Sequence, residues 1–257
     1  MKTHYRLEGT PEGAAVTLSH PLGASLELWD AQAAALEDRY RVLRYDVRGH
    51  GASDVPPGPY TLEQMAGDLH AVLQAEHIAS THFVGLSMGG LIGMTAALTW
   101  PRAIASLVLC DTTSCYGAGI RAMWDDRIHA AESQGMTDAL IERTMEIWFT
   151  PAFRERHKAT VDRVRAMLRA TNPRGYVGAV QAIAGVDLTD RLAAITCPTL
   201  VVVGERDPGT PPAMAQAIHE RIRGSRLLVL PDAAHCSVVE RAAEFNRALL
   251  AFLADLP

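Results

Sequence analysis

The feature that most constrains the fold is a serine in a glycine-rich turn between a strand-like and a helix-like segment. An apolar run at residues 82–86 leads into Gly85-Leu86-Ser87-Met88-Gly89, and small and apolar residues follow from 89 to 98. So tight a turn strains the serine backbone and closes only where flanking glycines leave room for the crossing chain. The pattern alone also arises by chance in glycine-rich loops. The flanking segments favour a strand, a sharp turn and a helix, with the Ser87 hydroxyl exposed as a nucleophile.

Short apolar segments alternate with helical patterns on both sides of the middle of the chain. Six segments are rich in Val, Leu and Ile and apolar on both faces, as buried parallel strands are: 14–19, 41–46, 82–86, 106–110, 199–204 and 226–230. Helical patterns lie between them, at 28–38, 62–76, 91–100, 212–223 and 238–256. This order predicts an α/β fold, a mainly parallel twisted sheet with helices on both faces. Residues 3–8 are expected to add an antiparallel edge strand.

The alternation stops between Tyr116 and Leu192. This stretch shows helical patterns and no convincing strand: 120–133, 137–149, 151–170 and 175–184. A helical insertion after one strand, followed by a return to the sheet, is expected to cover an active site and shield it from water. A packing appendage is the alternative. We therefore expect a core domain of residues 1–115 and 193–257, with a helical cap of residues 116–192 inserted in it.

The composition limits the classes of protein to which the chain can belong. Hydrophobic residues make up 48% of its 257 residues and charged residues 21%, enough for a sizeable core. The net charge of −5 and the lack of a basic run argue against nucleic-acid binding. No apolar stretch approaches the roughly 20 residues of a membrane span, and the N-terminus lacks the apolar core of a signal peptide. We expect a cytoplasmic protein without membrane contact, either a monomer or a homo-oligomer.

The chain shows no motif for a metal or a cofactor. No His, Cys and Asp cluster has metal-ligand spacing, and the glycine-rich nucleotide motifs are absent. Its four cysteines, Cys110, Cys115, Cys197 and Cys236, are interpreted as reduced thiols. Cys236 lies next to His235 and is either a reactive thiol or a small packing residue. Cofactor-free chemistry on a small molecule is the expectation.

A serine nucleophile needs a neighbouring base, and that base needs an acid to orient it. In doubly wound hydrolases the acid and then the histidine follow the serine along the chain, each just after a strand. Asp207 follows segment 199–204 and is the predicted acid. Its rivals are Glu205, otherwise a solvated loop charge, and Asp111, otherwise a turn carboxylate. His235 follows the last strand-like segment and is the predicted base.

Two backbone N–H groups are candidates for stabilising an oxyanion. The Met88 N–H lies at the start of the helix after Ser87, where the helix dipole also favours negative charge. The second donor is expected from the loop after segment 14–19, which reads His20-Pro21-Leu22-Gly23. Proline has no N–H, so Leu22 is the candidate. His20 either points into the site and touches substrate or bonds to nearby backbone.

Taken together, these residues resemble the α/β-hydrolase family over nearly the whole chain. Ser87, Asp207 and His235 fall at its triad positions, and the Asp46–Ser53 segment matches its Asp-x-Arg-Gly-x-Gly-x-Ser turn. Within the family the chain is most similar to 3-oxoadipate enol-lactonases, in the following stretches: 22–30, 45–51, 56–62, 124–128 and 175–176. This resemblance implies that water opens an enol-lactone ester to 3-oxoadipate, in aromatic catabolism. His20-Pro21 stands where those enzymes often have Asn-Ser.

The resemblance also implies a substrate with a carboxylate, and therefore a cation or donor in the cap. Arg127, beside Trp124, is the candidate, and Arg143 is a weaker one; a solvated helix face is the alternative for each. Trp124 and Trp148, with Met123 and Tyr176, are expected to line the pocket or to belong to the core.

Other functions use the same residues. A generic carboxylesterase or another lactonase shares the whole triad, and a perhydrolase or a carbon–carbon bond hydrolase is a more distant option. A haloalkane dehalogenase would have Asp at the turn, so Ser87 argues against it. A hydrolase-fold binding protein without catalysis is a further alternative, although such proteins often lose a triad residue.

Overall fold

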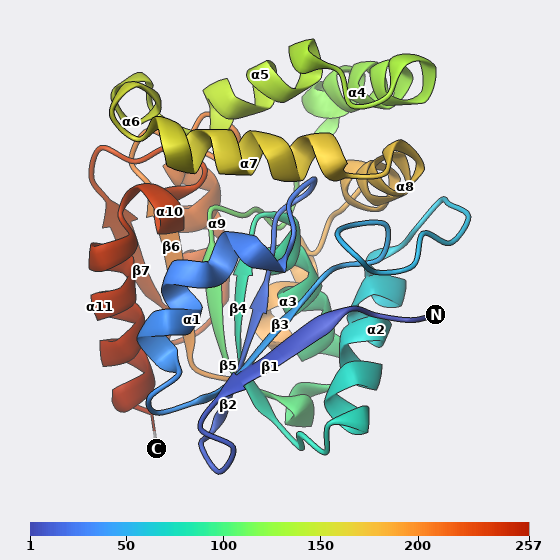
Figure 1. The fold of residues 1–257 in the computed structure, drawn as a ribbon. Helices are drawn as coiled ribbons and strands as arrows, with labels where there is room; N and C mark the ends of the chain where they lie inside the picture. The colour runs from blue at the N-terminus through green and yellow to red at the C-terminus, as the bar shows by residue number, and fades with distance from the viewer. Residues whose placement is uncertain (257) are drawn as a thin grey trace.

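The computed structural model describes residues 1–256, the side chain of Ala118 excepted. Within them, seven strands form one sheet in the order β1-β3-β2-β4-β5-β6-β7 (Figure 1). The strands are β1 (Tyr5–Gly9), β2 (Ala15–Ser19), β3 (Arg41–Tyr45), β4 (Thr81–Leu86), β5 (Ile104–Cys110), β6 (Thr199–Gly204) and β7 (Arg226–Leu230). β1 pairs antiparallel with β3 and every other pair is parallel, which confirms the predicted α/β fold and its edge strand.

Each face of the sheet is covered by its own helices and has its own core. The helices of one face are α1 (Asp30–Leu36) and α11 (Ala242–Ala254), and those of the other are α2 (Leu62–Ala75), α3 (Met88–Thr99) and α9 (Pro212–Arg221). Side chains of β5 alternate between the two cores. Leu107 and Leu109 pack with α2 and α3, whereas Val108 and Cys110 pack with α1 and α11. This two-sided burial explains why the strands are apolar on both faces.

Five helices lie together above the sheet in Figure 1, at the ends of the strands that precede the predicted site. They are α4 (Arg121–Gln134), α5 (Asp138–Trp148), α6 (Pro151–Arg156), α7 (Lys158–Ala170) and α8 (Pro173–Ala184). Short 3-10 turns complete the chain: η1 (Leu26–Trp29), η2 (Pro101–Ala103), η3 (Ala118–Ile120) and η4 (Thr189–Ala194). The division into a core and a cap at residues 116 and 192 stays a prediction.

Two helices that the sequence pattern predicts as continuous are broken. His157 has φ −118° and ψ 46° and separates α6 from α7, while its ring stacks on Phe153. Arg241 has φ −118° and ψ 41° and separates α10 (Ser237–Glu240) from α11, with its Nε donating to the Pro231 carbonyl. Neither break is at Gly or Pro. The first break coincides with stacking on a residue four positions earlier and the second with a bond to the loop after β7, and helical periodicity alone shows neither contact.

The five helices are attached to the rest of the molecule by close backbone packing and by hydrogen bonds. Gly175 of α8 lies against Gly49, and a Cβ added at Gly175 would meet the Gly49 carbonyl oxygen at 2.1 Å. Thr171, at the end of α7, donates its hydroxyl to the Gly23 carbonyl at 2.8 Å. Gly49 and Gly23 both lie in loops after strands, so α7 and α8 hold these loops in place.

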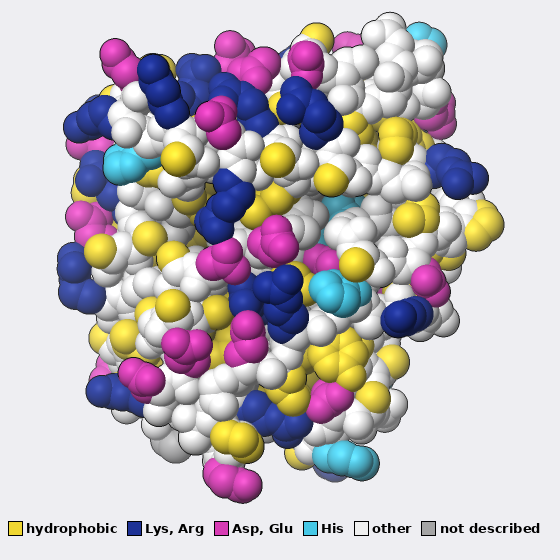
Figure 2. Space-filling model, in the orientation of Figure 1, with side chains coloured by type: hydrophobic (Ala, Val, Ile, Leu, Met, Phe, Trp, Pro, Cys, Tyr) yellow, Lys and Arg dark blue, Asp and Glu magenta, His cyan; other side chains and the backbone are white. Residues whose placement is uncertain are grey.

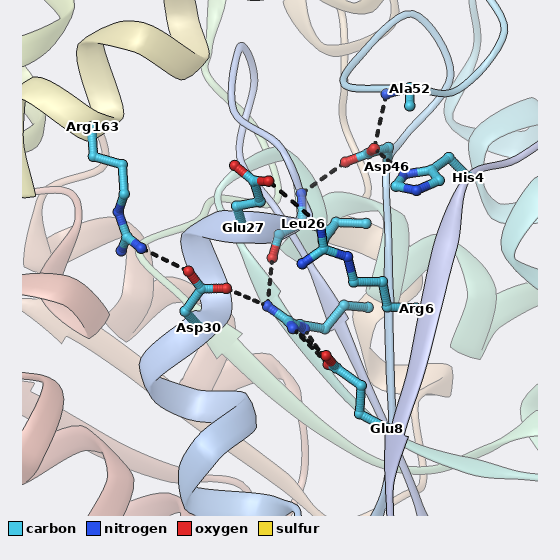
Figure 3. A network of polar contacts seen from close by, with 10 residues as sticks. His4, Arg6, Glu8, Leu26, Glu27, Asp30, Asp46, Ala52 and Arg163 are labelled. Carbon is cyan, nitrogen blue, oxygen red and sulfur yellow. Dashed lines mark hydrogen bonds and ion pairs between the residues drawn. The ribbon is translucent and has the colours of Figure 1, made fainter.

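A chain of ion pairs also reaches α7 (Figure 3). The nearly buried Arg44 of β3 binds Glu8 of β1 and Asp30 of α1, with the shortest N···O distance 2.6 Å in each pair. Asp30 also accepts from Arg163 of α7 at 2.6 Å. Over the whole face seen in Figure 2, acidic and basic side chains are interspersed. Among residues 1–256, no helix has the length and apolar character needed to cross a membrane.

Candidate active site

Ser87 lies in the turn between β4 and α3, as predicted. Its φ of 55° and ψ of −112° are strained for a residue with a side chain. A Cβ at Gly85 would meet the Gly89 backbone at 2.4 Å, and one at Gly89 would meet the Ser19 carbonyl oxygen at 2.2 Å. The Ser87 N–H donates to the Cys110 carbonyl at 2.9 Å. The turn therefore requires both glycines and holds the serine in one orientation.

Three side chains from three different strand ends form one hydrogen-bonded chain. His235 Nε2 lies 2.9 Å from Ser87 Oγ, and His235 Nδ1 lies 2.9 Å from Asp207 Oδ2. Ser87, Asp207 and His235 are 7%, 3% and 5% exposed, so bulk water barely reaches them. In this arrangement the imidazole can take the serine proton while the carboxylate orients the ring. The three residues selected from the sequence are thus brought together.

The Asp207 carboxylate is held by its own loop. Oδ1 accepts from the Gly209 N–H at 2.7 Å and the Thr210 N–H at 3.0 Å, and Oδ2 accepts from the Thr210 hydroxyl at 2.7 Å. The same hydroxyl lies 3.2 Å from His235 Nδ1. Thr210 was not selected from the sequence. The signal was there, since Asp-Pro-Gly is a turn sequence in which an aspartate bonds the backbone two residues ahead.

The charges of the acid and the base stabilise each other. Burial alone would raise the pKa of the Asp207 carboxyl, but the His235 ring and the Thr210 hydrogen bonds outweigh burial and lower it. Burial alone would lower the pKa of His235, but the Asp207 carboxylate outweighs burial and raises it. His235 is therefore a stronger base than a histidine in water, as proton abstraction from serine requires.

The two rival acids lie elsewhere. The Asp111 carboxylate accepts from the Gly204 N–H at 2.7 Å and the Ser237 hydroxyl at 2.6 Å, and it makes no hydrogen bond to His235. Glu205 is exposed and accepts from the Asp232 N–H at 3.1 Å. The geometry thus supports Asp207 as the partner of the histidine.

Leu22 and Met88 both lie next to Ser87. Met88 is the first residue of α3, and Leu22 lines the same cavity as the serine. Within residues 1–256, neither N–H donates to a protein acceptor. Neither group is engaged within the described residues, so both are free to donate to an oxyanion, and their role as its donors stays a prediction.

The prediction that His20 binds substrate is corrected by the structure. Its Nδ1 lies 2.8 Å from the Pro21 carbonyl, and its Nε2 accepts from the Val47 N–H at 2.9 Å. Both ring nitrogens are thus engaged by backbone, and the side chain is fully buried outside the cavity. His20 fixes the loop that carries Leu22, so it takes the second of its two expected roles, bonding to nearby backbone.

A cavity of about 110 Å³ lies between Ser87 with its neighbouring loops and the helices α4, α5 and α8. The predicted pocket residues Trp124, Arg127 and Trp148 line it, as do Ser87 and His235. Met123 and Tyr176, which were also expected there, belong to the lining; residues that the sequence did not indicate include Tyr116, Thr144, Ile147 and Ile183. The wall provided by the helices is mostly apolar, which suits a small organic substrate.

Arg127 is buried in this wall without a carboxylate partner. One guanidinium nitrogen donates to the Tyr176 hydroxyl at 3.1 Å, and the group lies 5.6 Å from the centre of the Trp124 ring. Within the described residues, neither Arg127 Nε nor Trp124 Nε1 has a hydrogen-bond partner. Arg143, the weaker candidate, is exposed and does not line the cavity. Two buried donors in this wall are therefore unsatisfied among residues 1–256.

The cysteines do not take part in the cavity. Cys110 and Cys236 are buried free thiols, and burial together with the nearby Asp111 raises the pKa of each well above its ordinary value. Such thiols are poor nucleophiles, so the structure favours packing for Cys236 over reactivity. Among residues 1–256, no cluster of three or more His, Cys, Asp or Glu side chains is suited to holding a metal ion.

Comparisons with known proteins point to one family. Residues 15–242 match the family described as alpha/beta hydrolase fold. The chain is 34% identical to 3-oxoadipate enol-lactonase 2 of Acinetobacter baylyi over 97% of this chain and 92% of that enzyme. It is 35% identical to a putative carbamate hydrolase, RutD, of Variovorax paradoxus, over 99% and 97%. The solved enol-lactonase of Burkholderia xenovorans LB400 superposes with a TM-score of 0.95 at 36% identity, covering 98% and 96%.

Proposed function

The chain belongs to the α/β-hydrolase family and is an ester or lactone hydrolase; from this premise we propose that it opens 3-oxoadipate enol-lactone with water, giving 3-oxoadipate. The proposal names both a reaction, acyl transfer from a lactone to water, and a substrate that carries a free carboxylate. The relatives from Acinetobacter baylyi and Burkholderia xenovorans bear enol-lactonase names, which supports the same substrate class.

The Arg127 guanidinium has no carboxylate partner among the described residues. This observation carries the choice of a carboxylated substrate. A buried cation is costly unless an anion meets it, and an unpartnered buried donor costs about 1–3 kcal/mol. Arg127 Nε and Trp124 Nε1 both lack partners and lie in side chains that line the cavity beside Ser87. A substrate carboxylate would satisfy both donors and leave the lactone carbonyl at the serine.

The proposed mechanism uses the hydrogen-bonded chain in two steps. Ser87 Oγ attacks the lactone carbonyl while His235 Nε2 takes its proton, and the Leu22 and Met88 N–H groups stabilise the oxyanion. The ring C–O bond then breaks, and the enol oxygen leaves with the proton from His235. Water attacks the acyl-serine with His235 again as base, which releases the carboxylic acid and restores Ser87. Asp207 keeps the imidazole oriented throughout.

We also propose that residues 116–192 act as a cap over this site. Trp124, Arg127 and Trp148 come from α4 and α5, whereas the reacting groups come from the ends of β4, β6 and β7. A substrate in the cavity would be enclosed between these two sets of residues. Water would then be excluded from the acyl transfer until deacylation requires it.

The experiment is to follow hydrolysis of freshly generated 3-oxoadipate enol-lactone by the wild type, beside p-nitrophenyl acetate and a simple carbamate ester. Fast lactone opening with weak turnover of the other two would support the proposal. Fast ester turnover without lactone opening would leave a generic carboxylesterase. Preference for the carbamate would favour the activity named for the Variovorax paradoxus relative.

Ser87→Ala is the decisive variant in the same assay. Loss of the nucleophile should lower kcat by about 10⁴-fold or more. Ser106→Ala is the matched control, because Ser106 is also a buried serine that bonds to a histidine, His82. Ser106 lies near the start of β5, whereas Ser87 lies at the opposite edge of the sheet, after the end of β4. A Ser87→Ala protein that keeps its activity while folded would refute the mechanism and leave a binding protein as an option.

A further inference from the structure

Asp111 is a buried carboxyl group that the mechanism above does not use. It follows β5, is 0% exposed, and has a φ of 42°, a region that Asp and Asn tolerate better than most residues. Its backbone N–H donates to the Val202 carbonyl at 2.8 Å, so the residue is tied to β6. Within residues 1–256 it forms no ion pair with Lys or Arg, although burying a carboxyl group without a cation costs free energy.

The two oxygens of this carboxyl group bind the two segments that carry the acid and the base. Oδ1 accepts from the N–H of Gly204, which ends β6 just ahead of the Asp207 loop. Oδ2 accepts from the hydroxyl of Ser237, which begins α10 just after His235. The carboxyl group therefore links one loop to the other, on the side away from the cavity.

We propose that Asp111 is a positioning residue that keeps Asp207 and His235 at hydrogen-bonding distance by linking Gly204 to Ser237. The inference rests on the roles proposed above for Asp207 and His235, and it does not depend on which ester is the substrate. Both loops follow strands, and they are also joined by the Arg206 N–H, which donates to the Ala233 carbonyl at 2.8 Å. The Asp111 bridge is thus a second link, which holds the chain just after His235, whereas the first holds it just before. A displacement of about 1 Å at such a site can cost about 10²-fold in rate.

Three variants separate this role from general stabilisation. In Asp111→Asn the amide oxygen still accepts from Gly204 and the NH₂ group donates to the Ser237 hydroxyl, so kcat should stay within about threefold of wild type. Asp111→Ala breaks both bonds and should lower kcat about 10- to 100-fold with KM within about twofold. Ser237→Ala breaks one bond and should lower kcat by about three- to tenfold. Ser106→Ala should behave as wild type.

The pH profile of kcat/KM gives a readout that a loss of folded protein would not change. The charged groups that face His235 are Asp207, Asp111 and Arg127. Asp111 itself raises the pKa of His235, and Asp111→Asn removes that carboxyl group while it keeps both links. If Asp111→Ala also loosens the contact between Asp207 and His235, its acidic limb lies at lower pH than that of Asp111→Asn. Ser106→Ala should leave the limb in place.

The measurement uses p-nitrophenyl acetate, with rates expressed per active site after titration with a fluorophosphonate and with folding checked by circular dichroism. A wild-type kcat in Asp111→Ala, with an acidic limb that coincides with that of Asp111→Asn, would overturn the inference, as would Asp111→Asn being as slow as Asp111→Ala. If Asp111→Ala does not fold, Ser237→Ala takes its place in the test. An unchanged kcat in Ser237→Ala would then overturn the inference. Activity in Ser87→Ala would instead refute the proposed mechanism itself.

Discussion

The active-site cavity has two walls, one that carries Ser87 and His235 and an opposite one that carries Trp124 and Arg127. The two walls differ in how far their polar groups are hydrogen-bonded within the protein. On the Ser87 wall the polar side chains are paired: serine with histidine, histidine with aspartate, and aspartate with three donors of its own loop. On the opposite wall, Arg127 Nε and Trp124 Nε1 are buried without partners in the described part of the chain. One wall is complete in the protein alone, whereas in the other, two donors are left unsatisfied among residues 1–256.

This difference assigns a separate task to each wall. A prearranged set of hydrogen bonds does not have to reorganise during the reaction, so it favours the chemical step. Unsatisfied donors favour binding, because a ligand that pairs with them regains the free energy lost on burial. Variants in the first wall should therefore change kcat, and variants in the second should change KM.

Asp207→Asn, a change in the first wall, should have the largest effect. The amide cannot stabilise the imidazolium and presents an N–H where His235 needs an acceptor, so kcat should fall by about 10⁴-fold, as in a serine protease with the same change. KM for p-nitrophenyl acetate should change little. A normal kcat in this variant, together with a large loss in Asp111→Asn, would transfer the role of the acid to Asp111.

Arg127→Met should produce the next largest effect, on binding alone. Hydrogen bonds to charged groups contribute about 1.5–3 kcal/mol, so KM for a carboxylated lactone should rise roughly 10- to 100-fold. KM for a neutral ester should stay within about threefold, because no anion is lost. Arg143→Met is the control, since Arg143 is exposed on α5 outside the cavity. Equal effects on both substrates would remove the role proposed for Arg127.

The two walls also differed in how far the sequence could predict them. Ser87, Asp207 and His235 each follow a strand, and strand ends are visible as short apolar segments with turn residues after them. The parallel sheet then brings these ends to one edge, so order along the chain was enough to select them. The glycines around Ser87 were informative for the same local reason, since a Cβ at Gly85 or Gly89 would clash with backbone.

The remaining features depend on side-chain contacts that hydrophobic periodicity does not show. The breaks at His157 and Arg241 follow from stacking on Phe153 and a bond to Pro231. The sequence position of His20 borders the site and suggested a role in substrate binding, but its ring bonds to Val47 from the next strand end. Such pairings have no local signature, and neither does the place of Tyr116 beside Ser87 in the cavity.

Trp124→Phe should have a smaller effect than Arg127→Met. The change keeps an aromatic side chain but replaces the indole by the smaller phenyl ring and removes its N–H. We therefore expect kcat/KM for the carboxylated lactone to fall about three- to tenfold, which is more than the fall for the neutral ester. The free energy of unfolding without ligand should fall only by the packing cost of the smaller ring, because the lost donor has no partner among residues 1–256. Trp29→Phe is the matched control, as its indole nitrogen is also unpartnered but lies outside the cavity. An equal loss with both substrates would point to packing.

The smallest expected effect is an electrostatic coupling between the walls, measured with p-nitrophenyl acetate. Burial lowers the pKa of His235, but the Asp207 carboxylate outweighs burial, so the pKa of His235 lies above its ordinary value of 6.5. The Arg127 cation opposes this rise. Because the base must be neutral, kcat/KM should fall as the pH decreases through a midpoint above 6.5. Arg127→Met removes the cation, so the midpoint should move further up, and it should move less at high salt than at low salt. A midpoint that stays in place or moves down would mean that the charge of Arg127 does not reach His235, and that the walls act independently.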